Sequence, residues 1–237
     1  NFPGGGAPKP PLLHEEVKAE LGGSGIVSGW GLTEAPILTM GASTDPSEKL
    51  ARTEGRAMPG VELIAIKPDG KKAQAGEEGE LRAKAPQLML GYLDSQLDDD
   101  AFDENGYFQT GDLGIIDEDG YVVISGRLKD VIIRYGEYIS AKEVEDLLFQ
   151  HPSIMDVAVI GLPDEVTGER ACAVLSINKE AAPITIEEMQ KYLDDAGLRR
   201  NAIPEQLEII ELIPRNPSGK ITKNVLKEEF KNSAFLR

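Results

Sequence analysis

The sequence has few of the residues that mark disulfide-bonded or nucleic-acid-binding proteins. It has one cysteine, Cys172, which cannot form an internal disulfide and lies in an apolar run, so we expect a buried structural thiol. Lysine and arginine number 25 against 41 aspartate and glutamate residues, and the formal net charge is −16. Such a surface would repel phosphates, which argues against nucleic acid as a partner. No apolar run reaches the length of a transmembrane helix, and no secretory signal opens the chain.

These absences predict a cytoplasmic protein without a transmembrane segment. The 237 residues, 41% of them hydrophobic, are enough for one or two domains with a substantial core. Because the net charge is strongly negative, an anionic ligand must be met by locally clustered positive groups.

Residues 109–137 form the centre of the chain. Two β-rich runs, 113–116 and 121–124, flank an acidic, glycine-containing turn and predict a β-hairpin. Arginine, lysine and aspartate then cluster within residues 126–130. A cluster between two β-rich blocks fits a solvated linker or a hinge beside a polyanionic ligand, and composition favours the linker.

A second motif places an aromatic residue between two glycines. Residues 28–34 read Ser-Gly-Trp-Gly-Leu-Thr-Glu. Glycines on both sides can leave the Trp30 ring open to a purine, and the Thr33 hydroxyl and Glu34 carboxylate suit phosphate and Mg²⁺. The alternative is a core tryptophan in front of a helix start, which the residues alone favour.

Four motifs in order resemble the adenylate-forming superfamily, which includes acyl-CoA synthetases, firefly-type luciferases and the adenylation domains of peptide synthetases. The motifs are residues 29–34, residues 110–112 with 126–130, residues 135–137 in front of a helix, and residues 214–220. The resemblance covers nearly the whole chain. One such motif would be weak evidence, whereas four with family-like spacing are strong.

The resemblance implies an α/β fold in two parts. Residues 1–128 would be the C-terminal part of the AMP-binding domain, including a small β-barrel-like subdomain, and residues 129–237 a small mobile α/β lid domain. We expect the chain to begin partway through the larger domain. The missing N-terminal part would carry the motif that grips the β- and γ-phosphates, so these 237 residues alone should be inactive.

The resemblance also implies a nucleotide site. Its cofactor-binding residues would lie in the adenine loop, in the tryptophan motif and in the central stretch: Gly6, Ala7, Pro8, Ser28, Gly29, Trp30, Gly31, Thr33, Asp112 and Arg127. Trp30, where the family usually carries tyrosine, would pack on adenine. Thr33 would touch phosphate and Glu34 would hold Mg²⁺. Asp112 would bind the ribose hydroxyls, with Arg127 on ribose or phosphate beside it.

Three further positions concern movement and catalysis. Lys129 occupies the family's hinge position. Gly136 closes a hairpin that lines the entry of the CoA thiol, although Tyr135 stands where the family often has a second glycine. Lys220 would be the catalytic lysine, acting with Thr33 and Glu34. A lysine on a mobile glycine loop is otherwise usually only solvated.

The resemblance therefore predicts an ATP-dependent, AMP-forming ligase that converts a carboxylic acid to its acyl-CoA thioester. Its small molecules would be the acid, ATP or AMP, Mg²⁺ and CoA. The alternatives are an adenylating enzyme with another acceptor, either a carrier-protein thiol or oxygen, and a non-catalytic nucleotide-binding module. Runs 31–36 and 203–205 look similar to bacterial ligases for medium-chain, branched or alicyclic acids.

Overall fold

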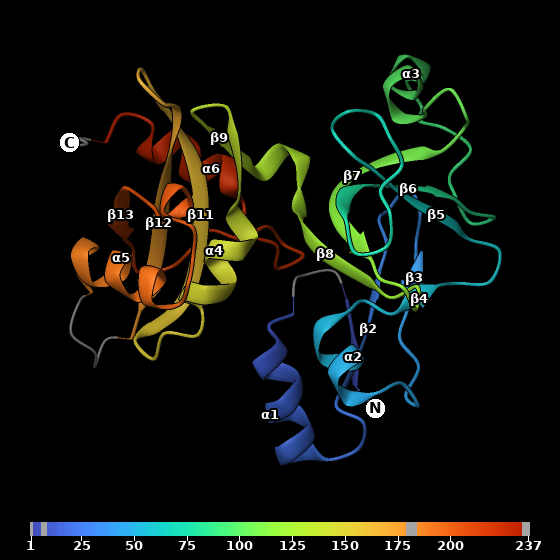
Figure 1. Ribbon diagram of the computed structural model, residues 1–237, viewed down its shortest axis with the longest axis horizontal. Coiled ribbons are helices and arrows are strands. Elements are labelled where there is room, and N and C mark those ends of the chain that lie inside the picture. The colour runs from blue at the N-terminus through green and yellow to red at the C-terminus, as the bar shows by residue number, and fades with distance from the viewer. Residues whose placement is uncertain (1, 6–8, 179–183, 234–237) are drawn as a thin grey trace. The chain divides into compact units, whose positions relative to one another are not determined.

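The computed structural model describes residues 2–5, 9–178 and 184–233. By its contacts the chain divides into two compact units, Asn1–Leu128 and Lys129–Arg237, and the fold is mixed α/β (Figure 1). Unit 1 contains β1 (Phe2–Gly4), α1 (Pro11–Leu21), β2 (Ile26–Trp30), β3 (Thr39–Met40), α2 (Ser47–Arg52), β4 (Arg56–Ala57), β5 (Glu62–Ile66), β6 (Glu78–Lys84), a 3-10 turn (Ser95–Leu97), α3 (Asp98–Ala101), β7 (Phe108–Ile116) and β8 (Val122–Arg127).

The first sheet of unit 1 has the strand order β1-β2-β3-β4. β1 pairs with β2 in parallel, whereas the other pairs are antiparallel. The polar composition of residues 39–57 predicts a surface loop, whereas the structure forms β3, α2 and β4 there. That interpretation is wrong for α2, which buries Leu50 and Ala51.

The second sheet of unit 1 is an antiparallel meander of order β5-β6-β7-β8. The hairpin expected around residues 117–120 is confirmed as the connection from β7 to β8. Closure into a small barrel is not found, because β5 and β8 stand at opposite ends of the strand order. The acidic composition of residues 94–104 predicts a solvated face or a short helix, and the structure forms the short helix α3 within it.

Unit 2 contains β9 (Val131–Arg134), β10 (Glu137–Ser140), α4 (Ala141–Leu148), β11 (Ile154–Asp164), β12 (Gly168–Ile177), α5 (Ile186–Asp195), a 3-10 turn (Arg200–Ala202), β13 (Gln206–Ile209) and α6 (Lys223–Phe230). A further 3-10 turn, Leu128–Asp130, lies where the two units meet in the sequence. The strand order is β10-β9-β12-β11, and β13 pairs in parallel with β12.

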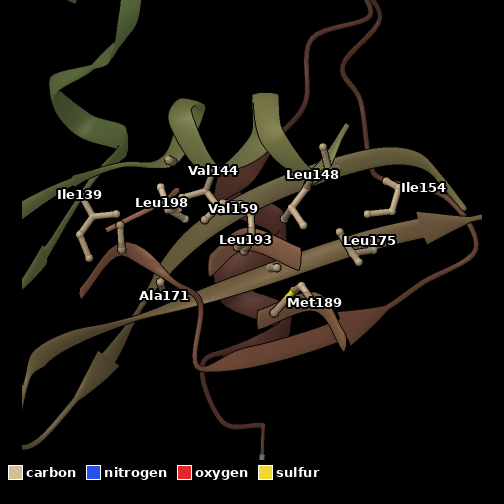
Figure 2. Packing of buried hydrophobic residues seen from close by; sticks show 14 of the residues in the cluster. Ile139, Val144, Leu148, Ile154, Val159, Ala171, Leu175, Met189, Leu193 and Leu198 are labelled. Carbon is tan, nitrogen blue, oxygen red and sulfur yellow. The ribbon is translucent and has the colours of Figure 1, made fainter. Parts of the chain in front are cut away.

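The sheet of unit 2 is buried on both faces, which explains the continuous apolar runs of β11 and β12. Alternate residues point to opposite faces of a strand. Val157 and Val159 therefore pack with α4 and α5, as Figure 2 shows for part of this cluster, while Ala158 and Ile160 pack with α6. Cys172 lies in the second cluster, where burial raises the pKa of its thiol to about 12, so it is a structural thiol as expected.

Candidate functional site

The tryptophan motif is the end of β2 followed by a tight loop. A Cβ on Gly31 would lie 2.4 Å from the backbone nitrogen of Ile37, and one on Gly29 would lie 2.6 Å from the carbonyl oxygen of Thr39. Both glycines are therefore required by close packing of the backbone. The loop leaves Thr33 exposed and Glu34 half-buried.

The glycines do not leave the Trp30 ring open. Only 8% of Trp30 is exposed, and it packs in a cluster with Leu38, Leu81 and Val122. Its indole Nε1 donates a hydrogen bond of 2.8 Å to Oδ2 of Asp112. In this chain Trp30 is therefore a core residue that also orients a carboxylate, and stacking on adenine stays a prediction.

Asp112 is the centre of a buried polar group. It lies on β7, is 3% exposed, and faces Arg127 across the β7–β8 pair. Nε of Arg127 lies 2.8 Å from Oδ1 of Asp112. Oδ1 is itself buried and pairs with Arg127 as an ion pair. Two charge-assisted contacts thus fix the orientation of this carboxylate.

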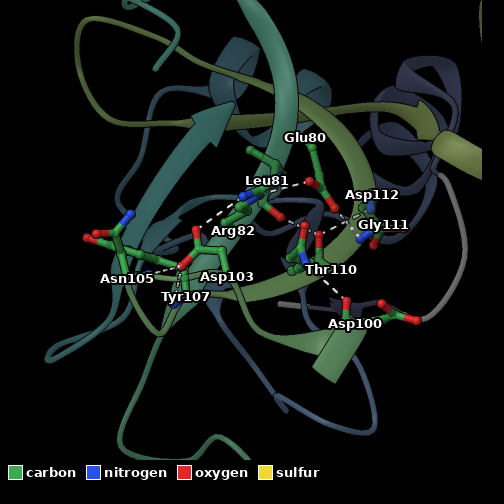
Figure 3. Close-up of polar contacts among 11 residues, drawn as sticks. Glu80, Leu81, Arg82, Asp100, Asp103, Asn105, Tyr107, Thr110, Gly111 and Asp112 are labelled. Carbon is green, nitrogen blue, oxygen red and sulfur yellow. Dashed lines mark hydrogen bonds and ion pairs between the residues drawn. The ribbon is translucent and has the colours of Figure 1, made fainter. Parts of the chain in front are cut away.

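The backbone around Asp112 is irregular and firmly held (Figure 3). Gly111 has a φ of 67°, and its N–H donates to Oε1 of Glu80 at 3.3 Å. The Thr110 hydroxyl donates to the carbonyl of Leu81 at 2.6 Å and accepts from the N–H of Asp112 at 3.1 Å. The strand register shifts on both sides of Asp112. Such bulges re-aim side chains and are common beside active sites.

A charged network contacts this part of β7 through Glu80. Arg82 contacts Glu80 at 2.8 Å and Asp103 at 3.1 Å (Figure 3). Burial would raise the pKa of Asp103, but hydrogen bonds from the N–H groups of Tyr107 and Asn105, together with Arg82, hold it below its ordinary value. The sequence analysis missed this network, because its members are ordinary charged residues of β6 and a loop.

Glu34 is positioned by a residue that the sequence analysis did not single out. The Tyr92 hydroxyl donates to Oε1 of Glu34 at 3.0 Å, and the N–H of Met89 donates to the Glu34 carbonyl at 2.8 Å. Burial and this carboxylate raise the pKa of Tyr92. No cluster of three or more metal-ligating side chains exists within the described residues. A single carboxylate fits Mg²⁺ that is carried largely by nucleotide phosphates.

The remaining residues expected around the nucleotide are Ser28, the loop 6–8 and Lys129. Ser28 is 2% exposed, and its hydroxyl has no hydrogen-bond partner among the described residues. Gly6, Ala7 and Pro8 lie outside the described residues. Lys129 is exposed within the 3-10 turn between the units, where a hinge remains a prediction.

The hairpin β9–β10 in unit 2 closes through a two-residue turn. Arg134 pairs with Glu137, and the turn residues Tyr135 and Gly136 have φ values of 52° and 77°. Two positive φ angles are the signature of a type I′ turn, which explains the glycine and makes Tyr135 a strained residue. Tyr135 is 66% exposed, and its N–H donates to the carbonyl of Thr167 at 2.8 Å.

Lys220 lies at the end of a short loop that closes on itself. The N–H of Asn216 donates to the Lys220 carbonyl at 2.9 Å, and the N–H of Lys220 donates to Oδ1 of Asn216 at 2.9 Å. Its side chain is exposed. The loop that glycine content alone would make mobile is thus held by hydrogen bonds at both ends of Lys220.

The structure brings Trp30, Asp112 and Arg127 together in unit 1 and places Lys220 and Gly136 in unit 2. Within unit 2 the latter two belong to opposite ends of β12. The hairpin adjoins Gly168, and Asp156, which holds the Lys220 loop, pairs with Ser176. These positions on β12 are about 26 Å apart at about 3.3 Å per residue.

Comparison with known proteins identifies the family. Residues 2–93 match the model of the AMP-binding enzymes, and residues 143–220 match that of the AMP-binding enzyme C-terminal domain. The chain belongs to the AMP-binding enzyme family. The resemblance found in the sequence motifs is confirmed.

Two curated relatives show the range of this family. The chain is 37% identical over 205 residues to the medium-chain fatty-acid–CoA ligase of Escherichia coli, covering 86% of this chain and 36% of that protein. It is 38% identical over 204 residues to the salicyl-AMP ligase / salicyl-S-ArCP synthetase of Mycobacterium tuberculosis, covering 85% and 36%. The chain therefore spans about a third of the length of these relatives.

A solved structure shares the fold. This chain matches o-succinylbenzoate CoA synthetase from Bacillus subtilis, in complex with its acyl-adenylate intermediate, with a TM-score of 0.83 and 29% identity. The match covers 99% of this chain and 46% of that protein. Among the described residues of this chain, no helix has the length and apolar character needed to span a bilayer.

Proposed function

We propose that the full-length protein activates a carboxylic acid with ATP as an acyl-adenylate and then transfers the acyl group to the thiol of CoA. The observation that carries this proposal is the buried Asp112 carboxylate, which Trp30 and Arg127 hold in one orientation at the position where the resemblance implies ribose binding. A ribose diol presents neighbouring O–H donors, and charge-assisted hydrogen bonds to a carboxylate are strong and directional.

In the first step, a carboxylate oxygen of the acid attacks the α-phosphorus of ATP, and pyrophosphate leaves. Negative charge accumulates on the oxygens at the transition state, where the ammonium of Lys220 would stabilise it. Thr33 would bind phosphate oxygen. Glu34, oriented by Tyr92, would hold Mg²⁺. When bound, this ion neutralises charge on the phosphates.

In the second step, the thiol sulfur attacks the acyl carbon, and the bond between that carbon and the AMP oxygen breaks. The Gly136 hairpin would line the path of the thiol. The placement of the hairpin and the Lys220 loop at opposite ends of β12 supports a mechanism in which unit 2 presents one of them at a time. Rotation about Lys129 would exchange them.

The acyl acceptor and the acid each have more than one candidate. The name of the Mycobacterium tuberculosis relative includes a carrier-protein product, so a carrier-protein thiol is the second candidate acceptor. Oxygen, as in luciferases, is a third. A non-catalytic binding module is disfavoured because the chain retains the expected groups of both units, including Glu34, Asp112 and Lys220. For the acid, we favour the medium-chain, branched or alicyclic class.

Pyrophosphate release by the full-length protein tests the proposal. It should be measured against a panel of linear, branched, alicyclic and aromatic acids, with no thiol, with CoA or with a pantetheinylated carrier protein. We expect acid-dependent release that CoA accelerates, with the acyl-CoA found by mass spectrometry. Acceleration by the carrier protein alone would overturn CoA as the acceptor. If no acid of the panel causes pyrophosphate release while AMP still binds, the binding module would be favoured.

A further inference from the structure

A polar side chain joins the loop that carries Lys220 to the sheet of unit 2, in addition to the packing of Ile221 on the buried cluster of β11 and β12. Arg215, the residue before the loop, uses both ends of its guanidinium group. Its NH1 donates to the carbonyl of Gly219 at 2.7 Å, and its NH2 contacts Oδ2 of Asp156 at 2.7 Å. Gly219 directly precedes Lys220, so the bridge ends one residue from the predicted catalytic lysine.

Asp156 is placed for this contact by an irregularity in β11. The register between β11 and β12 shifts between Ile154 and Asp156, and Oδ1 of Asp156 accepts the N–H of Val157 at 3.1 Å. The carboxylate is thus anchored to its own strand through Oδ1 and to Arg215 through Oδ2. A planar guanidinium that is always charged suits such a two-sided bridge better than an ammonium does.

From this geometry we infer that Arg215 and Asp156 act as positioning residues for Lys220 during adenylation. Asn216 fixes the backbone of Lys220 within the loop, but it does not join the loop to the rest of the unit. Arg215 supplies a polar connection beside the apolar packing of Ile221, and Asp156 neutralises its charge. A group displaced by about 1 Å from its productive position can lose up to about a hundredfold in rate.

The alternative is a surface ion pair with no role beyond folding. The side chain of Arg215 is 41% exposed and that of Asp156 22%, and pairs of this kind contribute little to stability. The two explanations therefore predict different results. Loss of a positioning pair would lower the adenylation rate at nearly constant stability. Loss of a merely structural pair would leave adenylation and thioester formation unchanged, or lower both together.

The inference rests on the proposed function, and the test separates the two half-reactions of the full-length enzyme. In Arg215→Gln, we expect kcat for acid-dependent pyrophosphate release to fall between about tenfold and a hundredfold, with KM for acid and ATP little changed. Thioester formation from added acyl-adenylate should be unchanged, because that step would use the Gly136 hairpin. The kcat of Arg215→Lys for pyrophosphate release should lie between those of Arg215→Gln and the unaltered enzyme.

Asp156→Ala should slow adenylation in the same direction, and the double variant should be no slower than Arg215→Gln, since residues that act as a unit are not additive. Lys191→Gln is the matched control. It removes a charge from another ion pair of unit 2, with Asp195, on helix α5 away from the loop. Its adenylation rate should equal that of the unaltered enzyme. Equal loss of both half-reactions in Arg215→Gln, or no loss of adenylation, would overturn the inference.

Hydrogen exchange gives a readout that does not need activity. In Arg215→Gln, amides 215–222 should exchange faster, whereas amides 141–148 of α4 should not change. If the unaltered enzyme releases no pyrophosphate, the proposed function fails while this measurement still decides whether Arg215 orders the loop. Unchanged exchange in residues 215–222 would overturn the ordering role.

Discussion

Two charged residues with proposed roles, Asp112 in unit 1 and Lys220 in unit 2, are held in opposite ways. Asp112 is 3% exposed and contacts side chains from two other strands. Lys220 is exposed, and within the described residues its ammonium has no ion-pair partner, while its backbone is fixed on both sides. The difference fits their proposed tasks. A recognition group benefits from a buried, preorganised network, whereas a group brought to the site by a moving unit must arrive with its charge unpaired.

The largest effect on activity should come from replacing the exposed Lys220. Lys220→Ala in the full-length enzyme should lower the adenylation rate on the order of 10²–10³-fold, because it removes a charge that stabilises the transition state. Transfer from added acyl-adenylate to CoA should continue, and pyrophosphate release measured beside it separates the two steps. Lys191→Ala, also an exposed lysine of unit 2, is the control and should be active. Full adenylation by Lys220→Ala would remove this residue from the chemistry.

The buried member should show its effect in nucleotide affinity. Asp112→Asn keeps an oxygen for the Trp30 indole but loses the charge beside Arg127, so we expect AMP to bind about ten- to a hundredfold more weakly. Isothermal titration with AMP measures this change in the full-length protein. Asp119→Asn, at an exposed turn, should bind AMP like the unaltered protein. Equal affinities in Asp112→Asn and the unaltered protein would contradict a role in ribose binding.

The network of Arg82 with Glu80 and Asp103 should make the folding stability of unit 1 fall in acid. Because the pKa of Asp103 is lowered in the folded state, its contribution to stability is present above the ordinary carboxyl pKa and is lost as pH falls below about 4. Asp103→Asn should cost about 1–3 kcal/mol at neutral pH and flatten the fall below pH 4. Urea unfolding followed by fluorescence of Trp30, the only tryptophan of this chain, reports on unit 1. An unaltered pH dependence would show that this carboxylate is not linked to folding.

The smallest effect concerns the strained turn of unit 2. Tyr135→Gly should stabilise the chain by up to about 1 kcal/mol, because relief of the left-handed conformation outweighs the added flexibility of glycine. Gly136→Ala should instead destabilise it, since φ is 77° there. Thermal unfolding of both variants gives the comparison. A destabilised Tyr135→Gly would mean that contacts of the ring, such as its stacking with the Arg134 guanidinium, offset the strain.

The elements of unit 2 followed from the sequence because their signals are local. The apolar runs 154–162 and 170–178 predict two strands, which the structure forms as β11 and β12. Thr185 predicts a helix start, and it forms a capping box with Glu188 at the start of α5. The site of unit 1 was predictable only in part. Trp30 and Asp112 stood out as residue types, but their hydrogen bond joins positions 82 residues apart. The contact of Tyr92 with Glu34 and the Arg82 network depend likewise on strand pairing, bulges and a long loop, which no local pattern specifies.

The most direct test of the account follows the oxygen of the acid. The full-length enzyme, supplied with ATP, CoA and a carboxylic acid labelled with ¹⁸O in both oxygens, should form AMP that carries one ¹⁸O atom. Attack on the α-phosphorus joins that oxygen to AMP, and the thiol then breaks the bond on its acyl side. Label in inorganic phosphate with ADP as the product, or AMP without label, would contradict adenylation of the acid and with it the central claim.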